Sequence, residues 1–131
     1  MDILVTSQVL EGMRSATQIA HPHEACGILL GKGRQVTSFA EAANVHSQPR
    51  RHFEIDPQAL IHAFRTEREG GLHVLGYFHS HPEGPAAPSI TDHEMAAGDD
   101  KIWAIVNDRE VAFWQDTSEG FKPLSYHLAD E

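Results

Sequence analysis

Apolar residues near the start of the chain recur mostly at the three- and four-residue spacing of an amphipathic helix: Val9, Met13, Ala16, Ile19 and Ala20. Ser7 precedes this pattern as a candidate N-cap, Glu11 falls in the first turns, and Pro22 ends the pattern. The spacing therefore predicts a first helix between Ser7 and Pro22.

Short apolar runs bounded by turn residues predict the strands. The run at 25–30 ends at Gly31-Lys32-Gly33, which predicts a buried strand and a tight turn into an antiparallel strand at 35–40. A third apolar run predicts a strand at 72–78. Three more strands are predicted near 102–106, 111–115 and 124–128.

The middle of the chain is polar and then becomes helical. Residues 44–51 are predicted as a loop because they are polar and contain Pro49, and a short extended piece follows at 53–55. Asp56-Pro57 then opens a second helix that ends at about Glu69.

A proline-rich loop leads to a third predicted helix, from Ser89 to about Ala97. Helices and strands thus mix along the chain, and no repeat or linker divides it. We expect an α/β fold in which helices flank one mixed β-sheet, and a single domain that covers residues 1–131.

Composition and charge exclude several classes of protein. Hydrophobic residues make up 40% of the chain and charged residues 22%, as in an ordinary globular protein. The formal net charge of −9 repels phosphate backbones, so we expect no nucleic-acid partner. The first residues lack the pattern of a secretory signal, and no apolar run is long enough to span a membrane. We therefore expect a cytoplasmic protein without a membrane partner.

Cys26 is the single cysteine of the chain. One cysteine excludes an intramolecular disulfide framework and any zinc site built from several thiolates. Because it lies in an apolar strand, we expect Cys26 to be a small, inert core residue.

Two histidines and an aspartate have the spacing of metal ligands. His79 and His81 are two residues apart at the end of a predicted strand, so their side chains project from the same face. Asp92 falls in the first turn of the third helix, beside the side chain of Ser89. Three protein ligands leave one tetrahedral position open, which is the pattern of a catalytic zinc site, where the pKa of bound water is lowered to about 7.

Glu24 is the candidate proton carrier for such a site. A carboxylate at the start of a buried strand is costly unless it has a partner, and water at the metal would be one. Two other zinc motifs fail. The peptidase motif H-E-x-x-H could start at His23 or His93, but Gly27 or Ala97 then stands where the second histidine is required. The deaminase motif H-x-E fails because His81 stands where its glutamate is required.

These residues together resemble the JAMM family of metalloproteases, also called MPN+ or JAB. Glu24 opens the sequence Glu-x-Cys-Gly-x-Leu-x-Gly of prokaryotic members, and His79-Ser80-His81, seven residues and Ser89-x-x-Asp92 complete the motif without a gap. A lone His-x-His pair is more often incidental, but here every element of the motif is present.

The resemblance implies a JAMM/MPN domain with a cytidine-deaminase-like fold. It also implies that His79, His81 and Asp92 bind Zn²⁺, that Glu24 acts as general base and then acid, and that Ser89 stabilises the tetrahedral oxyanion. Ser89 also has a purely structural interpretation as a helix N-cap, and the two roles are compatible.

The resemblance further implies a zinc-dependent peptidase or isopeptidase that acts on the C-terminal tail of a small ubiquitin-like or sulfur-carrier protein ending in Gly-Gly. The short chain favours the sulfur-carrier branch, and a homodimer is compatible with it. The alternative is a non-catalytic MPN-type scaffold that binds proteins. A relationship to the DNA-repair branch is disfavoured by the acidic charge balance and by the sequence around Glu24.

Four of the arginines form two pairs whose function the sequence leaves open. Arg50-Arg51, and Arg65 with Arg68, are interpreted either as solvated surface or as contacts to an acidic protein partner. One hypothesis is that residues 49–55 form an exposed sheet edge, to which an extended Gly-Gly tail is added as a further strand. Arg50 and Arg51 would then face the folded body of the partner.

Overall fold

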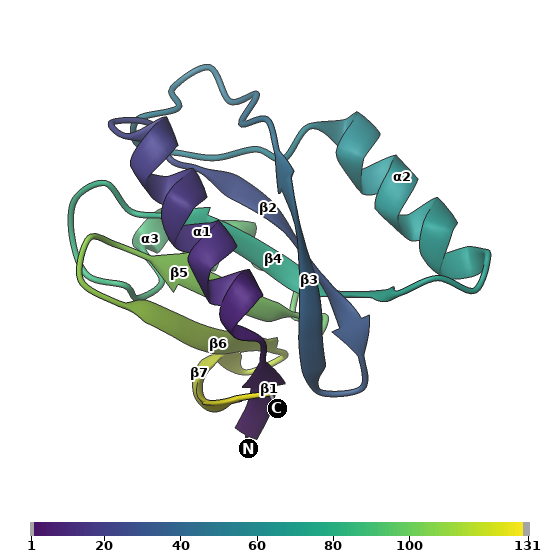
Figure 1. Cartoon of the computed structure of the whole chain (residues 1–131). Coiled ribbons are helices and arrows are strands. Elements are labelled where there is room, and N and C mark those ends of the chain that lie inside the picture. Colours follow the sequence, from purple (N-terminus) through teal and green to yellow (C-terminus); the bar gives the residue numbers. More distant parts are fainter. Residues whose placement is uncertain (1, 130–131) are drawn as a thin grey trace.

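Seven strands form one mixed sheet that closes on itself within residues 2–129, the part of the chain that the computed structural model describes (Figure 1). The strands follow the spatial order β1-β3-β2-β4-β5-β6-β7, and β7 pairs with β1. Three pairs are parallel, namely β1 with β3, β1 with β7 and β4 with β5. The strands are β1 (Asp2–Val5), β2 (Cys26–Lys32), β3 (Gln35–Ala42), β4 (His73–Ser80), β5 (Ile102–Val106), β6 (Val111–Thr117) and β7 (Gly120–Leu128).

Three helices accompany the sheet: α1 (Ser7–Ala20), α2 (Pro57–Arg68) and α3 (Ile90–Met95). The apolar side of α1 packs in one buried cluster with residues from all seven strands. α2 packs in a second cluster with side chains of β2 and β4. Successive residues of β2 divide between the clusters, since Ile28 belongs to the α2 cluster and Leu29 to the α1 cluster. Figure 1 shows α1 across the sheet and α2 beside β3.

The predicted α/β fold with a mixed sheet flanked by helices is confirmed, and most predicted elements lie within a few residues of their expected positions. Four details differ. The N-cap of α1 is Thr6, whose Oγ1 accepts the N–H of Val9 at 3.2 Å, and not Ser7. β1 was not predicted, β7 begins at Gly120, and α3 ends at Met95.

The strand pairing determines where the site lies. Cys26 at the start of β2 pairs with His79 near the end of β4, so the residues just before β2 lie beside the His-Ser-His sequence. On the other side, Ser80 pairs with Val106 of β5, and the N–H of His81 donates to the carbonyl of Val106 at 2.8 Å. β4 is therefore held on both sides where it ends. Among the described residues, no helix is long and apolar enough to cross a membrane.

Candidate metal centre

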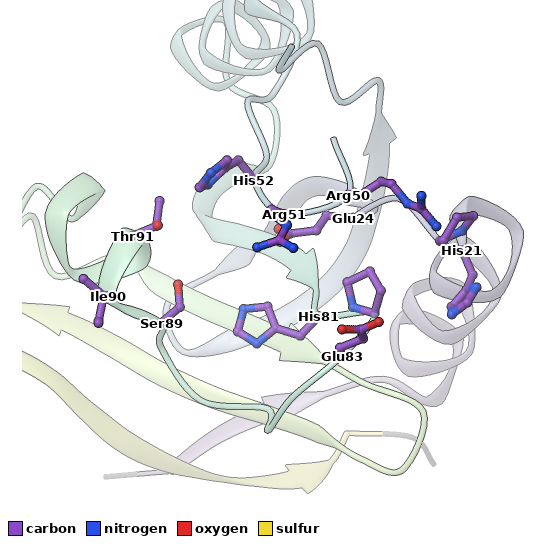
Figure 2. Close-up of a pocket in the computed structure, with 12 residues that line it drawn as sticks. His21, Glu24, Arg50, Arg51, His52, His81, Glu83, Ser89, Ile90 and Thr91 are labelled. Atoms are coloured by element: carbon purple, nitrogen blue, oxygen red, sulfur yellow. The ribbon is translucent and has the colours of Figure 1, made fainter. Parts of the chain in front are cut away.

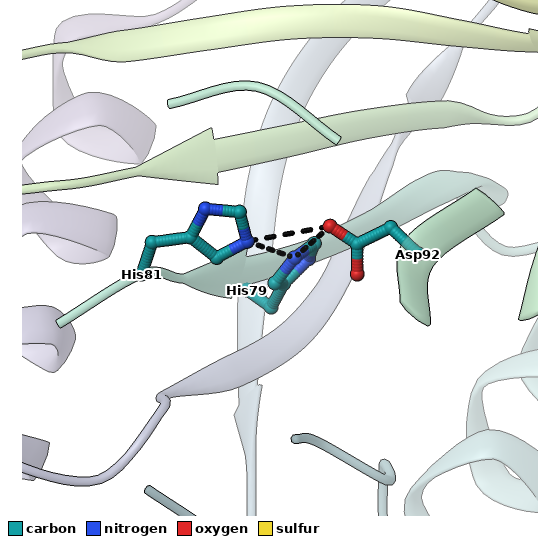
Figure 3. Close-up of side chains that lie close together, drawn as sticks. All are labelled: His79, His81 and Asp92. Carbon is teal, nitrogen blue, oxygen red and sulfur yellow. Dashed lines mark hydrogen bonds and ion pairs between the residues drawn. The ribbon is translucent and has the colours of Figure 1, made fainter. Parts of the chain in front are cut away.

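Three potential ligand atoms converge where β4 meets α3 (Figure 3). His79 Nε2 lies 3.1 Å from His81 Nε2 and 3.1 Å from Asp92 Oδ2, and His81 Nε2 lies 3.3 Å from the same oxygen. All three residues are buried, and His79 is completely inaccessible. The spacing of the histidines and of Asp92 along the chain thus becomes a compact donor cluster in space.

This donor set fits a metal ion. Metal–ligand bonds of about 2.0–2.1 Å in a tetrahedral site place ligand atoms roughly 3.3 Å apart, close to the three observed distances. Two imidazole nitrogens and one carboxylate oxygen are also typical ligands of first-row metals. Three protein donors leave one tetrahedral position for water or substrate, as in catalytic sites.

The surroundings of both histidines orient their Nε2 atoms toward the cluster. His81 Nδ1 lies 2.8 Å from the carbonyl oxygen of Pro85, which assigns the proton to Nδ1 and the lone pair to Nε2. The ring of His79 stacks on Phe53, with centroids 4.3 Å apart, and meets the edge of Trp103 at 5.7 Å. Burial lowers the pKa of His79 despite the nearby Asp92, and this favours the neutral, metal-binding form.

Asp92 is fixed by a reciprocal capping box with Ser89 at the start of α3. The Ser89 N–H donates to Asp92 Oδ2 at 2.9 Å, and the Asp92 N–H donates to Ser89 Oγ at 3.1 Å. Burial acts to raise the pKa of Asp92, but the hydrogen bonds to His79, His81 and Ser89 outweigh it, so the pKa is lowered and the carboxylate is charged. Ser89 Oγ accepts in the cap and keeps its own proton for another acceptor.

Glu24 lies in the wall of a cavity of about 840 Å³ that His81 and Ser89 also line (Figure 2). The residue is only 7% exposed. Burial raises the pKa of Glu24 to about 7, although the charge of His81 opposes this effect. A carboxyl with this pKa both accepts and releases a proton near neutral pH.

The arginine pairs are separated by the fold. Arg50 and Arg51 line the cavity, and Figure 2 shows Arg50 turned toward His21. Arg65 and Arg68 lie in the last turn of α2, outside this cavity. The hypothesis of a sheet edge at 49–55 is wrong, because this segment contains no strand and makes only an isolated bridge through Ile55.

Sequence reasoning missed part of the cavity wall. His21, Pro22, His52 and Ile90 also line it, and no local signal in the sequence distinguishes them from ordinary surface residues. Cys26 behaves as predicted, because it is buried and burial raises the pKa of its thiol to about 12.

Comparison with known sequences gives one family and several relatives. The profile of prokaryotic homologs of the JAB domain matches residues 6–117. The chain is 33% identical over 107 residues to the desampylase of Haloferax volcanii, covering 79% of this chain and 77% of the relative. It is 36% identical over 94 residues to the probable TtuB-protein conjugate cleaving protease of Thermus thermophilus, covering 72% of this chain and 63% of the relative.

Solved structures show the same fold. A protein from Desulfitobacterium hafniense superposes with a TM-score of 0.85 at 28% identity and covers 100% of this chain and 94% of its own. A JAB1/MPN domain protein from Archaeoglobus fulgidus superposes with a TM-score of 0.67 at 17% identity and covers 98% of this chain and 100% of its own.

Proposed function

Because the chain belongs to the family of prokaryotic homologs of the JAB domain, we propose that it is a metal-dependent hydrolase that cleaves amide bonds at the C-terminal tail of a small ubiquitin-like or sulfur-carrier protein. The observation that carries this proposal is the convergence of His79, His81 and Asp92 in one buried cluster, of which His81 lines the same cavity as Glu24. The relatives named as a desampylase and as a conjugate cleaving protease support the substrate class.

We propose Zn²⁺ as the metal, because two imidazole nitrogens and one carboxylate oxygen 3.1–3.3 Å apart fit a zinc site with three protein ligands. His79 and His81 would hold it through Nε2 and Asp92 through Oδ2. When bound, zinc supplies a Lewis acid that polarises the scissile carbonyl and lowers the pKa of water to about 7.

The residues of the chain provide the proton transfers. Glu24 takes a proton from the attacking water as general base and delivers it to the leaving amine as general acid. Its raised pKa of about 7 suits both directions of transfer. The hydroxyl proton of Ser89 is available to donate to the developing oxyanion, because Ser89 Oγ serves the helix cap as an acceptor only.

Two cationic side chains at the cavity, Arg50 and Arg51, support a protein substrate with an acidic surface. Arg50 and Arg51 make no side-chain hydrogen bond or ion pair with the residues that the structure describes, so both guanidinium groups are available to a partner. Opposite charges on the substrate would increase the association rate more than the affinity. All the groups named here come from one chain, so the proposed chemistry requires no homodimer. We propose that residues 1–131 form one JAB domain that works in the cytoplasm.

The alternative of a non-catalytic scaffold is disfavoured. Non-catalytic, metal-free members of the family usually lack residues of the motif, whereas here three buried donors converge, and one of them, His81, lines the same cavity as the buried carboxyl of Glu24. Burying these polar groups is costly, and binding a protein at the surface would not require it.

The direct test is hydrolysis of a sulfur-carrier protein linked through its Gly-Gly carboxyl to a lysine ε-amine. With zinc present, the wild-type protein should release the carrier, and Glu24→Gln should retain the metal but turn over about 10²–10⁴-fold more slowly. Glu83→Gln is the matched control because Glu83 is an exposed carboxylate of the same cavity. Equal turnover by Glu24→Gln and wild type would remove Glu24 from the mechanism, and no cleavage by the wild type would overturn the proposed function.

A further inference from the structure

Asn44 lies two residues after the end of β3, and its side chain binds backbone groups of Glu24 and of three residues in its own loop. Its Nδ2 donates to the carbonyl oxygens of Glu24 and His52, each at 3.0 Å. Its Oδ1 accepts the N–H of His46 at 3.1 Å and of Glu54 at 3.0 Å. Both hydrogens and both lone pairs of the amide are therefore used.

The orientation of this amide is determined by its partners. Exchanging Oδ1 and Nδ2 would place an oxygen against two carbonyls and an NH₂ group against two N–H donors. Asn44 is also half-buried, so lost hydrogen bonds would not all be replaced by water.

Closing the loop at 44–55 does not require the bond to Glu24. The N–H of Val45 donates to the carbonyl of Glu54 at 2.9 Å, and the N–H of Asp56 donates to the carbonyl of Ala43 at 3.1 Å. These backbone bonds close the base of the loop. The bond from Asn44 to Glu24 instead joins the loop to a different segment, which lies 20 residues earlier in the sequence.

The position of Glu24 depends on its backbone. No hydrogen bond from the described residues reaches its carboxylate, so no side-chain partner fixes it directly. Its own N–H donates to the carbonyl of Pro49 at 2.7 Å, and its carbonyl accepts from Asn44. Both backbone groups of Glu24 are thus held by the loop that Asn44 organises.

We propose that Asn44 is a positioning residue for the hydrolysis, which acts by fixing the backbone of Glu24 so that its carboxylate faces the His79, His81 and Asp92 cluster. The inference rests on the proposed function of Glu24 and adds the residue that places it. Misplacing a reacting group by about 1 Å costs roughly 10²-fold in rate, so an error in the backbone of Glu24 has a large effect.

Asn44→Asp is the sharpest test because it keeps the shape and the Oδ1 acceptor while replacing the Nδ2 donor with an oxygen. We expect kcat on the lysine-linked carrier to fall about 10²-fold, with KM and zinc content near the wild-type values. Asn44→Ala removes the amide without adding charge, and it should lower kcat similarly if Asn44→Asp does not fold. Glu67→Ala is the control, since Glu67 Oε1 accepts the N–H of Val74 at 2.7 Å at the opposite end of β4.

A double-mutant cycle separates positioning from general stabilisation. In the Glu24→Gln background, Asn44→Asp should have little further effect on the residual rate, because the residue on which it acts is already disabled. Amide exchange of Glu24, followed by NMR, should be faster in Asn44→Asp than in Glu67→Ala, whether or not residual turnover is measurable.

The outcomes distinguish the two proposals. An inactive wild-type protein overturns the proposed function. An active wild type whose kcat is unchanged by Asn44→Asp overturns the positioning role, and so does unchanged amide exchange at Glu24. An equal fall of kcat in Asn44→Asp and Glu67→Ala also overturns it, because this would reflect only lost stability.

Discussion

The hydroxyl oxygen of Ser80 accepts a hydrogen bond from the backbone N–H of Ala25 at 2.8 Å. The Ser80 N–H donates in turn to the carbonyl of Ala25 at 3.0 Å. Ser80 stands between His79 and His81, and Ala25 follows Glu24. This pair of bonds therefore connects the segment with two candidate metal ligands to the segment with the candidate base.

Ser80→Ala should destabilise the protein by about 1–3 kcal/mol, because it leaves the buried N–H of Ala25 without an acceptor. Urea unfolding of the metal-free protein measures this difference without a contribution from zinc binding. Ser118→Ala is the control, since Ser118 is exposed and a change of less than about 0.5 kcal/mol is expected. Equal stabilities of Ser80→Ala and Ser118→Ala would contradict the assigned contribution of the Ser80 bond.

Removal of any one ligand should abolish tight metal binding. The purified protein should contain about one zinc per chain, whereas His79→Ala, His81→Ala and Asp92→Ala should each lose it, as elemental analysis will measure. His73→Ala provides the control because His73 is an exposed residue at the other end of β4. Full zinc retention by the His79→Ala/His81→Ala double mutant would disprove this metal site.

Glu24 should make the metal-free protein less stable as the pH rises. Burial raises its pKa from 4.5 to about 7, so the folded state binds a proton more tightly than the unfolded state. The favourable contribution is complete below about pH 4.5 and is lost as the pH rises through about 7. Above that pH the charged carboxylate remains buried.

Thermal unfolding in a chelator, measured from pH 4.5 to 8, tests this dependence. Glu24→Gln lacks the titrating group, so its stability relative to wild type should increase across this range. The comparison cancels the titration of histidines that do not interact with Glu24, whereas His81, whose pKa the charge of Glu24 raises, contributes to the difference together with Glu24. A stability difference that does not vary with pH would show that Glu24 is not buried in a costly environment.

Reversing the charge of Arg50 and Arg51, which line the cavity, should weaken the recognition of the large substrate only. Arg50→Glu/Arg51→Glu should raise KM for an intact carrier conjugate, while kcat and cleavage of a short Gly-Gly peptide stay nearly unchanged. The effect should weaken as salt is added. Arg65→Glu/Arg68→Glu makes the same change of charge on α2, away from the cavity, and should have little effect.

If the two double substitutions raise KM equally, the change of net charge alone is responsible, and the substrate does not dock specifically at the cavity. A parallel change for the conjugate and the short peptide would instead place Arg50 and Arg51 at the tail and not at the folded body of the substrate.

Local signals in the sequence were sufficient where an element is specified by its own residues. α2 begins as predicted after Asp56, because this side chain accepts the N–H of Gln58 at 3.0 Å and Pro57 is suited to the first helical position. The Ser89 cap and its partner Asp92 were also predictable, because their three-residue spacing is itself the geometry of a capping box.

Elements that depend on distant partners were missed or shortened. β1 has only four residues and exists through its parallel pairing with β3 and β7, which no local pattern reveals. The predicted strand began at Leu124, whereas β7 begins at Gly120 and includes Pro123, which has no N–H to donate to a neighbouring strand. Pro123 is tolerated because β1 pairs only with Ser125–Leu128, so Pro123 has a neighbouring strand on one side alone.

The candidate chemical groups of the site follow from the sequence alone. Metal ligands and proton carriers require particular side chains, so His79, His81, Asp92 and Glu24 could be named as candidates by type and spacing, and the family resemblance added Ser89. The arrangement of these groups in space follows only from the folded chain. Glu24 is buried beside the cluster because β2 pairs with β4, and its backbone is held by Asn44, for which the sequence predicted only a position in a polar loop. Such contacts join residues far apart in the chain, and their hydrogen bonds depend on folded geometry that no local pattern encodes.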